Sequence, residues 1–222
     1  MIRHKIKLER EFSKVLFTAD QHLFHSRLLE KGNCRRAEAL RPQEGESLID
    51  CMNRTVVQQW NEAVKAAGPG SVVFCLGDLS FHNNSASREL IAGMGGDTKY
   101  LIRGNHDSKL PAGWSAGYDG FVDLEIKEPS SGRVLLITAS HYPMAAWKES
   151  HYGTWCLHGH CHGRLQVECE GRFDVGVETS IERVLLPRPL PFAPYSLVEL
   201  LAIMGEPRYW FQGNEPRGHH HG

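Results

Sequence analysis

The hydrophobic pattern in the first half of the chain alternates between short apolar runs and longer amphipathic stretches. Residues 15–17 and 72–76 are continuous apolar runs, which predict buried strands, the first of them extending to residue 18. Residues 47–66 place apolar side chains at helical spacing, and this predicts an amphipathic helix that Gly68-Pro69-Gly70 ends. A shorter helix is expected over residues 86–94. Helices that connect successive strands in this way are typical of an α/β fold.

Strands dominate the pattern in the second half of the chain, and a short leading strand is expected over residues 5–9. The later candidates are residues 100–103, 121–126, 133–139, 155–158, 165–169 and 173–177. A polar, arginine-rich loop is expected over 25–45, a proline-rich connector over 186–194, and a last apolar segment over 197–203. The sequence therefore predicts two stacked sheets flanked by helices, with active-site loops at the ends of the strands.

The composition is that of a single globular enzyme domain. With 222 residues, of which 41% are hydrophobic and 23% charged, the chain can bury a substantial core. We expect one domain over residues 1–212 and a polar, histidine-rich, disordered tail over 213–222. The formal net charge of −1 gives no basic footprint for nucleic acid, so nucleic acid enters only as an alternative substrate.

Nothing in the sequence predicts export or membrane insertion. No apolar stretch is long enough to span a bilayer, and the charged N-terminus is not followed by the apolar segment of a secretory signal. The six cysteines show no disulfide spacing. We therefore expect a cytoplasmic protein with reduced thiols and no membrane partner.

Side chains that can bind metal recur in five short segments, most of which follow a predicted strand. The segments are Asp20-Gln21-His22, Gly77-Asp78, Gly104-Asn105-His106-Asp107, Ser140-His141 and Gly159-His160-Cys161-His162. In extended geometry, residues two apart point to the same side, so each Asp-x-His or His-x-His pair presents two ligands together. One such pair alone is more often an ordinary surface loop. The five segments together, in this order along the chain, predict one metal centre bound by carboxylates and histidines.

The order of these motifs resembles the calcineurin-like metallophosphoesterase superfamily, whose pattern is Asp-x-His, Gly-Asp, Gly-Asn-His-(Asp/Glu), His and Gly-His-x-His. The resemblance covers residues 15 to about 180, and residues 17–25 are most similar to small bacterial and phage phosphoesterases. It implies a four-layer α/β/β/α sandwich of two mixed sheets flanked by helices. It also implies hydrolysis of small phosphomono- or phosphodiesters through attack of a metal-bound hydroxide. The alternatives are a nuclease or cyclic-nucleotide phosphodiesterase, and a non-catalytic metal-binding scaffold.

The resemblance implies two divalent metal ions. One would be held by Asp20, His22, Asp78 and His162. The other would be held by Asp78, Asn105, His141 and His160, so that Asp78 bridges the two. Two such ions leave about two positive charges after Asp20 and Asp78 are counted, which suits an anionic substrate. Nitrogen and oxygen ligands accept Mn²⁺, which we expect, and equally Fe, Zn²⁺ or Ni²⁺.

Residues beside the ligands are candidates for contact with the substrate. The resemblance implies that His106 faces the substrate, as a general acid or a stabiliser of charge, and that Asp107 orients it. Many members of the superfamily carry arginine three residues after the Gly-Asp aspartate, but this chain has Phe81 there and lacks that clamp on phosphate. Candidates to contact the substrate in its place are His25, His82 and Arg103.

Overall fold

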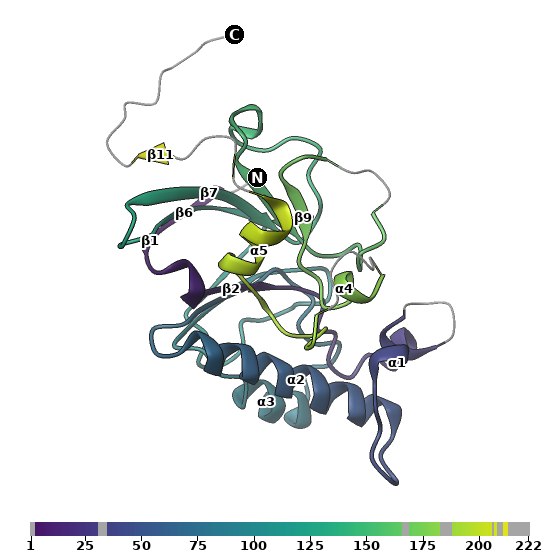
Figure 1. Ribbon diagram of the computed structural model, residues 1–222. Helices are drawn as coiled ribbons and strands as arrows, with labels where there is room; N and C mark the ends of the chain where they lie inside the picture. The colour runs from purple at the N-terminus through teal and green to yellow at the C-terminus, as the bar shows by residue number, and fades with distance from the viewer. Residues whose placement is uncertain are drawn as a thin grey trace.

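The computed structural model contains two β-sheets with helices against them (Figure 1). It describes residues 3–30, 35–165, 169–182, 188–205, 207 and 211–212. One sheet has the strand order β10-β2-β3-β4-β5, and the other has the order β1-β6-β7-β8-β9 with β11 paired to β7. Both sheets are mixed, because each combines parallel and antiparallel pairs. The predicted α/β sandwich of two mixed sheets flanked by helices is confirmed.

The five-stranded sheet carries four parallel strands, β2 to β5, in the order of the chain. Its strands are β2 (Val15–Thr18), β3 (Val72–Cys75), β4 (Thr98–Ile102), β5 (Ala116–Tyr118) and β10 (Tyr195–Ser196). The six-stranded sheet consists of β1 (Arg3–Glu9), β6 (Phe121–Lys127), β7 (Arg133–Ser140), β8 (Trp155–His158), β9 (Arg172–Asp174) and β11 (Phe211–Gln212). The carboxyl ends of β2, β3 and β4 lie at one edge, because these strands run in parallel.

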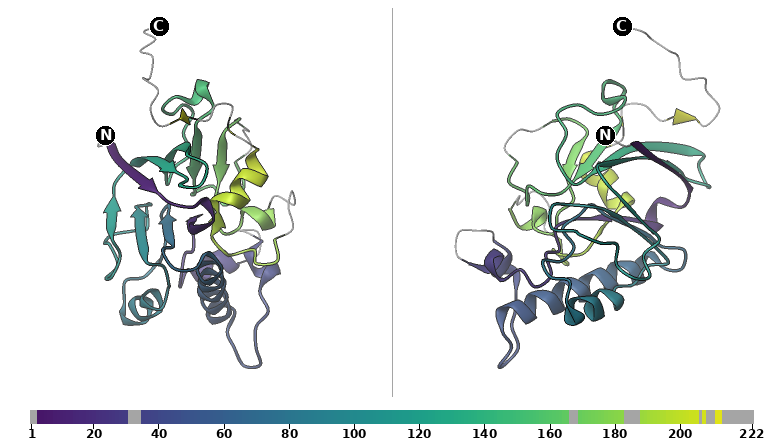
Figure 2. Two further views of the ribbon diagram at one scale, coloured as in Figure 1. Left: turned by 60° about the vertical axis from the view of Figure 1, so that its left-hand side comes forward. Right: turned by 180° about the vertical axis from the view of Figure 1, so that it is seen from behind.

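Two helices cover the outer face of the five-stranded sheet, α2 (Leu48–Ala67) and α3 (Ser85–Ala92), and they lie side by side in Figures 1 and 2. The Ser47 side chain caps α2 by accepting the Asp50 N–H. The stripe of apolar residues on α2 is buried against β2 and β3, as its helical spacing predicts. α3 ends at Ala92, two residues before its predicted end.

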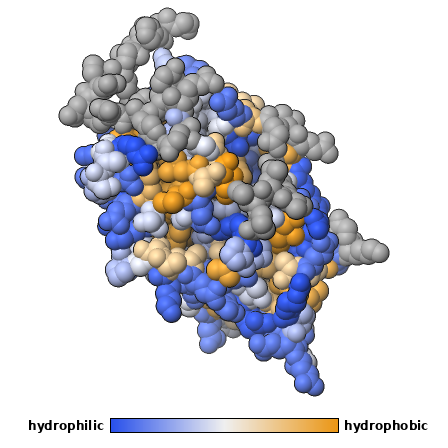
Figure 3. All heavy atoms as spheres, viewed as in Figure 1, coloured by the Kyte–Doolittle hydropathy of each residue, from blue (hydrophilic) through white to orange (hydrophobic). Residues whose placement is uncertain are grey.

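The remaining helical segments are short, apart from α5 (Leu197–Met204). They are α1 (Arg36–Ala39), α4 (Thr179–Glu182), and the 3₁₀ turns Phe12–Lys14, Ser26–Leu29 and Ser150–Tyr152. α5 begins in a capping box, in which the Ser196 and Glu199 side chains accept each other's backbone N–H. On the face drawn in Figure 3, hydrophobic residues gather over α5. None of the helices within the described ranges is long and apolar enough to span a bilayer.

The central strands are buried on both faces, which explains their continuous apolar runs. Phe17 of β2 and Phe74 of β3 stack at 5.2 Å between the two sheets. Leu16 and Val73 point the other way and pack beneath α2 and α3. The strand ends are therefore held on a rigid, fully packed support.

Several sequence-based boundaries change in the structure. The strand predicted over 173–177 ends at Asp174, and the predicted loop over 25–45 contains α1 with a fully buried Arg36. β5 is only three residues long and gives no apolar signal in the sequence. Residues 166–168 of the strand predicted over 165–169 lie outside the described residues. The same holds for the tail predicted over 213–222.

Candidate metal centre

Loops at the carboxyl ends of five strands carry the predicted ligands. The loops after β2, β3 and β4 emerge together at one edge of the five-stranded sheet. β7 and β8 run parallel in the other sheet and present His141 and residues 160–162. The His160 N–H donates to Asp20 Oδ2 at 2.9 Å, which joins the loops of the two sheets.

Five of the predicted ligands have a left-handed backbone. Their φ angles are 61° at Asp20, 47° at His22, 56° at Asp78, 69° at His160 and 50° at His162. Left-handed backbone is uncommon and costly outside glycine, and it concentrates at functional sites. The sequence predicted that Asp20 and His22 lie in extended backbone and therefore face the same side. This prediction of the backbone is wrong, because β2 ends at Thr18 and both residues are left-handed.

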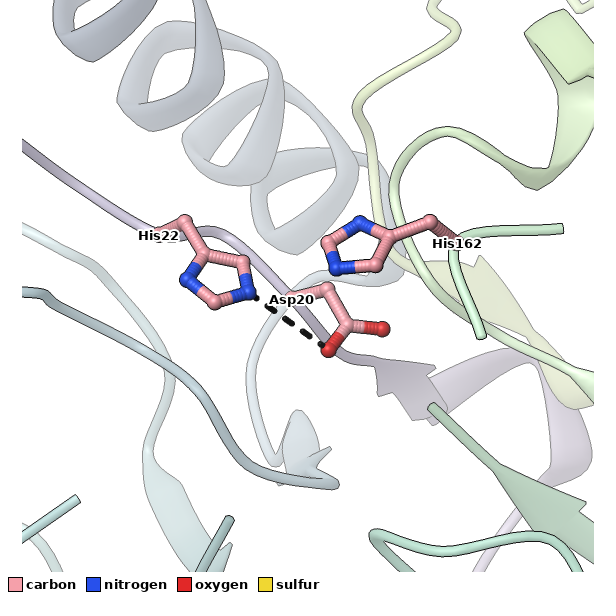
Figure 4. Close-up of side chains that lie close together, drawn as sticks. All are labelled: Asp20, His22 and His162. Carbon is pink, nitrogen blue, oxygen red and sulfur yellow. Dashed lines mark ion pairs between the residues drawn. The ribbon is translucent and has the colours of Figure 1, made fainter. Parts of the chain in front are cut away.

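The ligand atoms gather into three overlapping groups, and within each group they lie within 4.8 Å of one another. The groups are Asp20, His22 and His162; His22, Asp78 and His106; and Asp78, His141 and His160. Figure 4 shows the first group, with Asp20 and His22 on the loop after β2 and His162 on the loop after β8. The dashed line in it joins His22 Nε2 to Asp20 Oδ1, 4.0 Å apart.

Asp78 lies between histidines that belong to the two predicted ligand sets. Its Oδ2 is 3.4 Å from His22 Nε2 and 3.4 Å from His141 Nε2. Asn105 Oδ1 is 3.2 Å from the same His141 nitrogen. Burial raises the pKa of Asp78, but hydrogen bonds from the His141 ring and the His106 N–H lower it by more. The net pKa is lowered, so the carboxylate is held ionised. A carboxylate in this position could be a ligand of two metal ions, one on each side.

The buried charge and polarity of the centre fit divalent cations. His22 Nε2 is buried and has no hydrogen-bond partner, which is costly unless an ion occupies its lone pair. The pKa of Asp20 is raised well above its usual range by burial and by the carboxylates of Asp174 and Glu178. An excess of buried carboxylate is relieved by a bound cation. The predicted ligand residues are therefore chemically suited to a dinuclear site.

Two glycines of the motifs are needed because the ligands lie directly against their backbone. A Cβ at Gly104 would lie 2.2 Å from Asp78 Oδ1, and a Cβ at Gly159 would lie 2.8 Å from Asp20 Oδ2. Neither distance is sterically allowed, so any larger residue would push the carboxylate out of the centre. This is the physical reason for glycine in Gly-Asn-His-Asp and Gly-His-Cys-His.

His141 is oriented by the backbone of the neighbouring sheet. Its Nδ1 lies 2.8 Å from the Leu76 carbonyl oxygen, which points Nε2 toward Asp78. A backbone carbonyl that accepts from one ring nitrogen fixes the tautomer and leaves the other nitrogen free to bind metal. Burial lowers the pKa of His141, but the Asp78 carboxylate raises it more, and the net direction is upward.

The structure gives Asp107 a different role from the predicted one. Its two carboxylate oxygens accept the backbone N–H groups of Asp78, Leu79 and Gly104, at 2.7, 3.1 and 2.9 Å. Both oxygens are thus engaged by the backbone instead of by the ring of His106. Asp107 joins the loop after β3 to the loop after β4 and fixes the position of Asp78.

The predicted substrate-contacting residues fall into two sets. His25 Nδ1 lies 3.3 Å from His22 Nδ1, and the His25 ring stacks on Phe81 with centroids 4.1 Å apart. His82 packs edge-on against the same phenyl ring, at 5.0 Å. Arg103 is instead paired with Asp119, at 2.8 Å. The structure therefore brings His25 to the centre, places His82 against Phe81, and engages Arg103 elsewhere.

The sequence reasoning missed a buried ion pair beneath the centre. Arg36 and Glu178 are both fully buried, and their side chains are hydrogen-bonded to each other. Arg36 also donates to the carbonyl oxygens of Asp20 at 2.7 Å and Gln21 at 2.6 Å. Glu178 Oε2 lies 3.2 Å from His162 Nδ1. Burial raises the pKa of Glu178, but Arg36 lowers it more, to about 2.

The Arg36–Glu178 pair supports two predicted ligands that are far apart in the sequence, Asp20 and His162. Arg36 holds the backbone of the Asp20 loop, and Glu178 places a carboxylate against the ring of His162. A carboxylate behind a metal-binding histidine orients the ring and raises its basicity. Arg36 stands in an arginine-rich segment that looks solvated, so no sequence signal singles it out.

The model of the calcineurin-like phosphoesterase family matches residues 13–208 of the chain. The protein therefore belongs to this family, and the resemblance drawn from the motifs is confirmed. Among solved structures, it is similar to the crystal structure of a protein of unknown function, AQ665 from Aquifex aeolicus. The two share 18% sequence identity with a TM-score of 0.53, over 85% of this chain and 98% of that one, which shows a common fold. No curated protein matches the sequence.

Proposed function

We propose that the protein is a dinuclear-metal phosphoesterase that hydrolyses small phosphate mono- or diesters. The observation that carries this proposal is the set of three overlapping ligand groups with Asp78 in two of them. Two divalent cations, when bound, would polarise the phosphate, neutralise its charge and lower the pKa of a water that serves as nucleophile. Asp20, His22, Asp78 and His162 would hold one, and Asp78, Asn105, His141 and His160 the other.

We propose that His106 acts on the substrate side of the centre. Its backbone N–H donates to Asp78 Oδ1 at 2.9 Å, and its ring packs edge-on against His22 with centroids 5.1 Å apart. The side chain is partly exposed, so a bound ester can reach it. From there the imidazolium can protonate the leaving oxygen or stabilise charge on the phosphoryl oxygens.

The first test is metal analysis followed by a screen of phosphate esters with added Mn²⁺. We expect up to two transition-metal ions for each chain and hydrolysis of bis(p-nitrophenyl) phosphate. A diester is expected because Phe81 stands where many members of the superfamily carry the arginine that would clamp a terminal phosphate. Protein that binds two ions and cleaves only monoesters would contradict the diester preference. Metal-loaded protein inert toward mono-, di- and cyclic esters would favour a non-catalytic scaffold.

A second prediction separates the two roles of His106. If the imidazolium protonates the leaving oxygen, His106→Ala should lower kcat/KM for an alkyl ester by about 10²–10⁴-fold, because an alkoxide needs that proton. The loss for a matched nitrophenyl ester should be much smaller, since nitrophenolate leaves without protonation. The measurement is the ratio of the two losses in a matched pair of diesters. Equal losses would eliminate the general-acid role and leave charge stabilisation.

A further inference from the structure

An exposed aromatic ring stands at the edge of the candidate metal centre. Phe81 is 41% exposed, although it is a large hydrophobic residue. One face of its ring is stacked on His25, with an interplanar angle of 9°, and its centroid lies 5.4 Å from that of His106. An exposed aromatic ring beside groups that can bind a ligand offers a surface on which a planar group can stack.

The backbone holds Phe81 firmly in this position. Its N–H donates to the Leu23 carbonyl oxygen at 2.9 Å, and Leu23 and Ser80 form an isolated parallel bridge. Ser80 Oγ in turn donates to the His82 carbonyl oxygen at 2.9 Å. The backbone at Phe81 is therefore fixed relative to the loop that carries His22, and stacking on His25 orients the phenyl ring.

Phe81 forms one side of a hollow that reaches His106. The hollow has a volume of about 420 Å³, which lies within the range of about 300–1,000 Å³ typical of small-ligand sites. Its lining includes Phe81, His82, Asn83, Arg88, His106 and Lys109. We call this space the Phe81 hollow. It is large enough for a whole leaving group beyond the scissile phosphate.

The charged groups around the hollow select for a second anion. Arg88 and Lys109 are exposed on its wall, and Arg88 is positioned by a hydrogen bond from Nη1 to the Asn83 carbonyl oxygen at 2.9 Å. The carboxylate in the lining is that of Asp107, and both of its oxygens accept backbone N–H groups. A guanidinium and an ammonium in one hollow favour a phosphate.

We propose that the Phe81 hollow binds the leaving group of a small nucleotide phosphodiester, with its base against Phe81 and a further phosphate at Arg88 and Lys109. This assignment rests on the proposed function, because the scissile phosphate would sit on the metal ions beside His106. Stacking on an aromatic ring accepts any base. The net charge of −1 offers no extended basic track, which favours a dinucleotide over a polymer.

The test compares leaving groups that differ only in base and terminal phosphate. Substrates are the dinucleotides TpT, pTpT and TpTp, with thymidine methyl phosphate as the ester that lacks a second base. We expect Phe81→Leu to lower kcat/KM for the dinucleotides by about tenfold to a hundredfold, mainly through KM. The kcat/KM for the methyl ester should be nearly unaffected. Phe81→Trp, which keeps an aromatic ring, should retain a kcat/KM for the dinucleotides close to that of wild type. Equal losses for dinucleotide and methyl ester would overturn the proposal.

The charge assignment has its own matched variants. Arg88→Gln and Lys109→Gln should remove the preference for the form with a terminal phosphate while leaving TpT near wild type. Lys65→Gln, an exposed lysine on α2, is the control and should change neither. Retention of the preference in both hollow variants would overturn the assignment of the second phosphate, and a strong preference for long single strands would overturn the small substrate.

A binding measurement keeps the test independent of catalysis. The methylphosphonate analogues of pTpT and TpTp resist cleavage but keep both bases and the terminal phosphate. We expect titration calorimetry to show about tenfold weaker binding to Phe81→Leu than to wild type. If no ester is cleaved, the proposed function fails, but weaker binding of the analogues to Phe81→Leu than to wild type would still support the Phe81 hollow as a binding site. Equal affinity for wild type and for Phe81→Leu would overturn it.

Discussion

Replacing Asp78 with asparagine is expected to release one or both metal ions and to lower turnover by several orders of magnitude. Asp78 Oδ2 lies 3.4 Å from His22 Nε2 and 3.4 Å from His141 Nε2, which belong to different predicted metal sites. The substitution removes the negative charge of Asp78. Asparagine keeps a carbonyl oxygen that can accept the His106 N–H, so the fold should survive. Metal content by mass spectrometry and kcat under saturating Mn²⁺ are the measurements. Wild-type metal content and rate in this variant would exclude Asp78 as the bridge.

A matched variant controls for the loss of a carboxylate as such. Asp119→Asn removes an exposed carboxylate that pairs with Arg103, and it should leave metal content and turnover unchanged. Circular dichroism and thermal melting of both variants in chelator compare their folds without bound ions. A loss of activity in Asp78→Asn that is matched by unfolding in chelator would point to structure instead of metal binding.

The second large effect is expected on stability, from removal of Arg36. Arg36→Met leaves Glu178 buried without its ion pair and leaves the carbonyl oxygens of Asp20 and Gln21 without a donor. Breaking a buried pair by removing one partner costs about 3–5 kcal/mol. Urea unfolding in the presence of chelator should show a loss of this size, because chelator removes any contribution from bound metal.

The neighbouring arginine provides the control. Arg35 is exposed and pairs with the exposed Glu38, so Arg35→Met should change the unfolding free energy little. Adding Glu178→Gln to Arg36→Met should recover part of the loss, because the uncompensated charge disappears while the two carbonyl oxygens stay without their donor. An Arg36→Met variant as stable as Arg35→Met would show that the buried pair contributes nothing to folding.

The elements and motifs that sequence could predict are those written in local patterns. β2 and β3 are continuous apolar runs because both their faces are covered, and α2 shows its buried stripe directly. The ligand motifs follow these elements at fixed spacing, so their gathering at strand ends could be expected. β5 could not be predicted, because Ala-Gly-Tyr has neither the length nor the apolar content of a typical strand.

What the sequence could not show depends on contacts between distant segments. Arg36 and Glu178 are 142 residues apart, and each looks like a solvated charge until the fold buries them together. The left-handed backbone at Asp20 and His22 is likewise set by the packed surroundings, since neither residue prefers it. Phe81 was visible as a departure from the family pattern, but its stacking on His25 needed the parallel bridge between their loops.

The distribution of the ligand groups along the chain has a consequence for synthesis on the ribosome. The described residues form three groups, and the earliest to be completed ends at His106, while the others wait for His160 and His162. Glu178 is made later still, so Asp20 and His22 are synthesised before the ion pair that supports them can form. Each of the two predicted metal sites includes a histidine of the loop after β8, His162 in one and His160 in the other, so we expect neither site to be complete before that loop has been made.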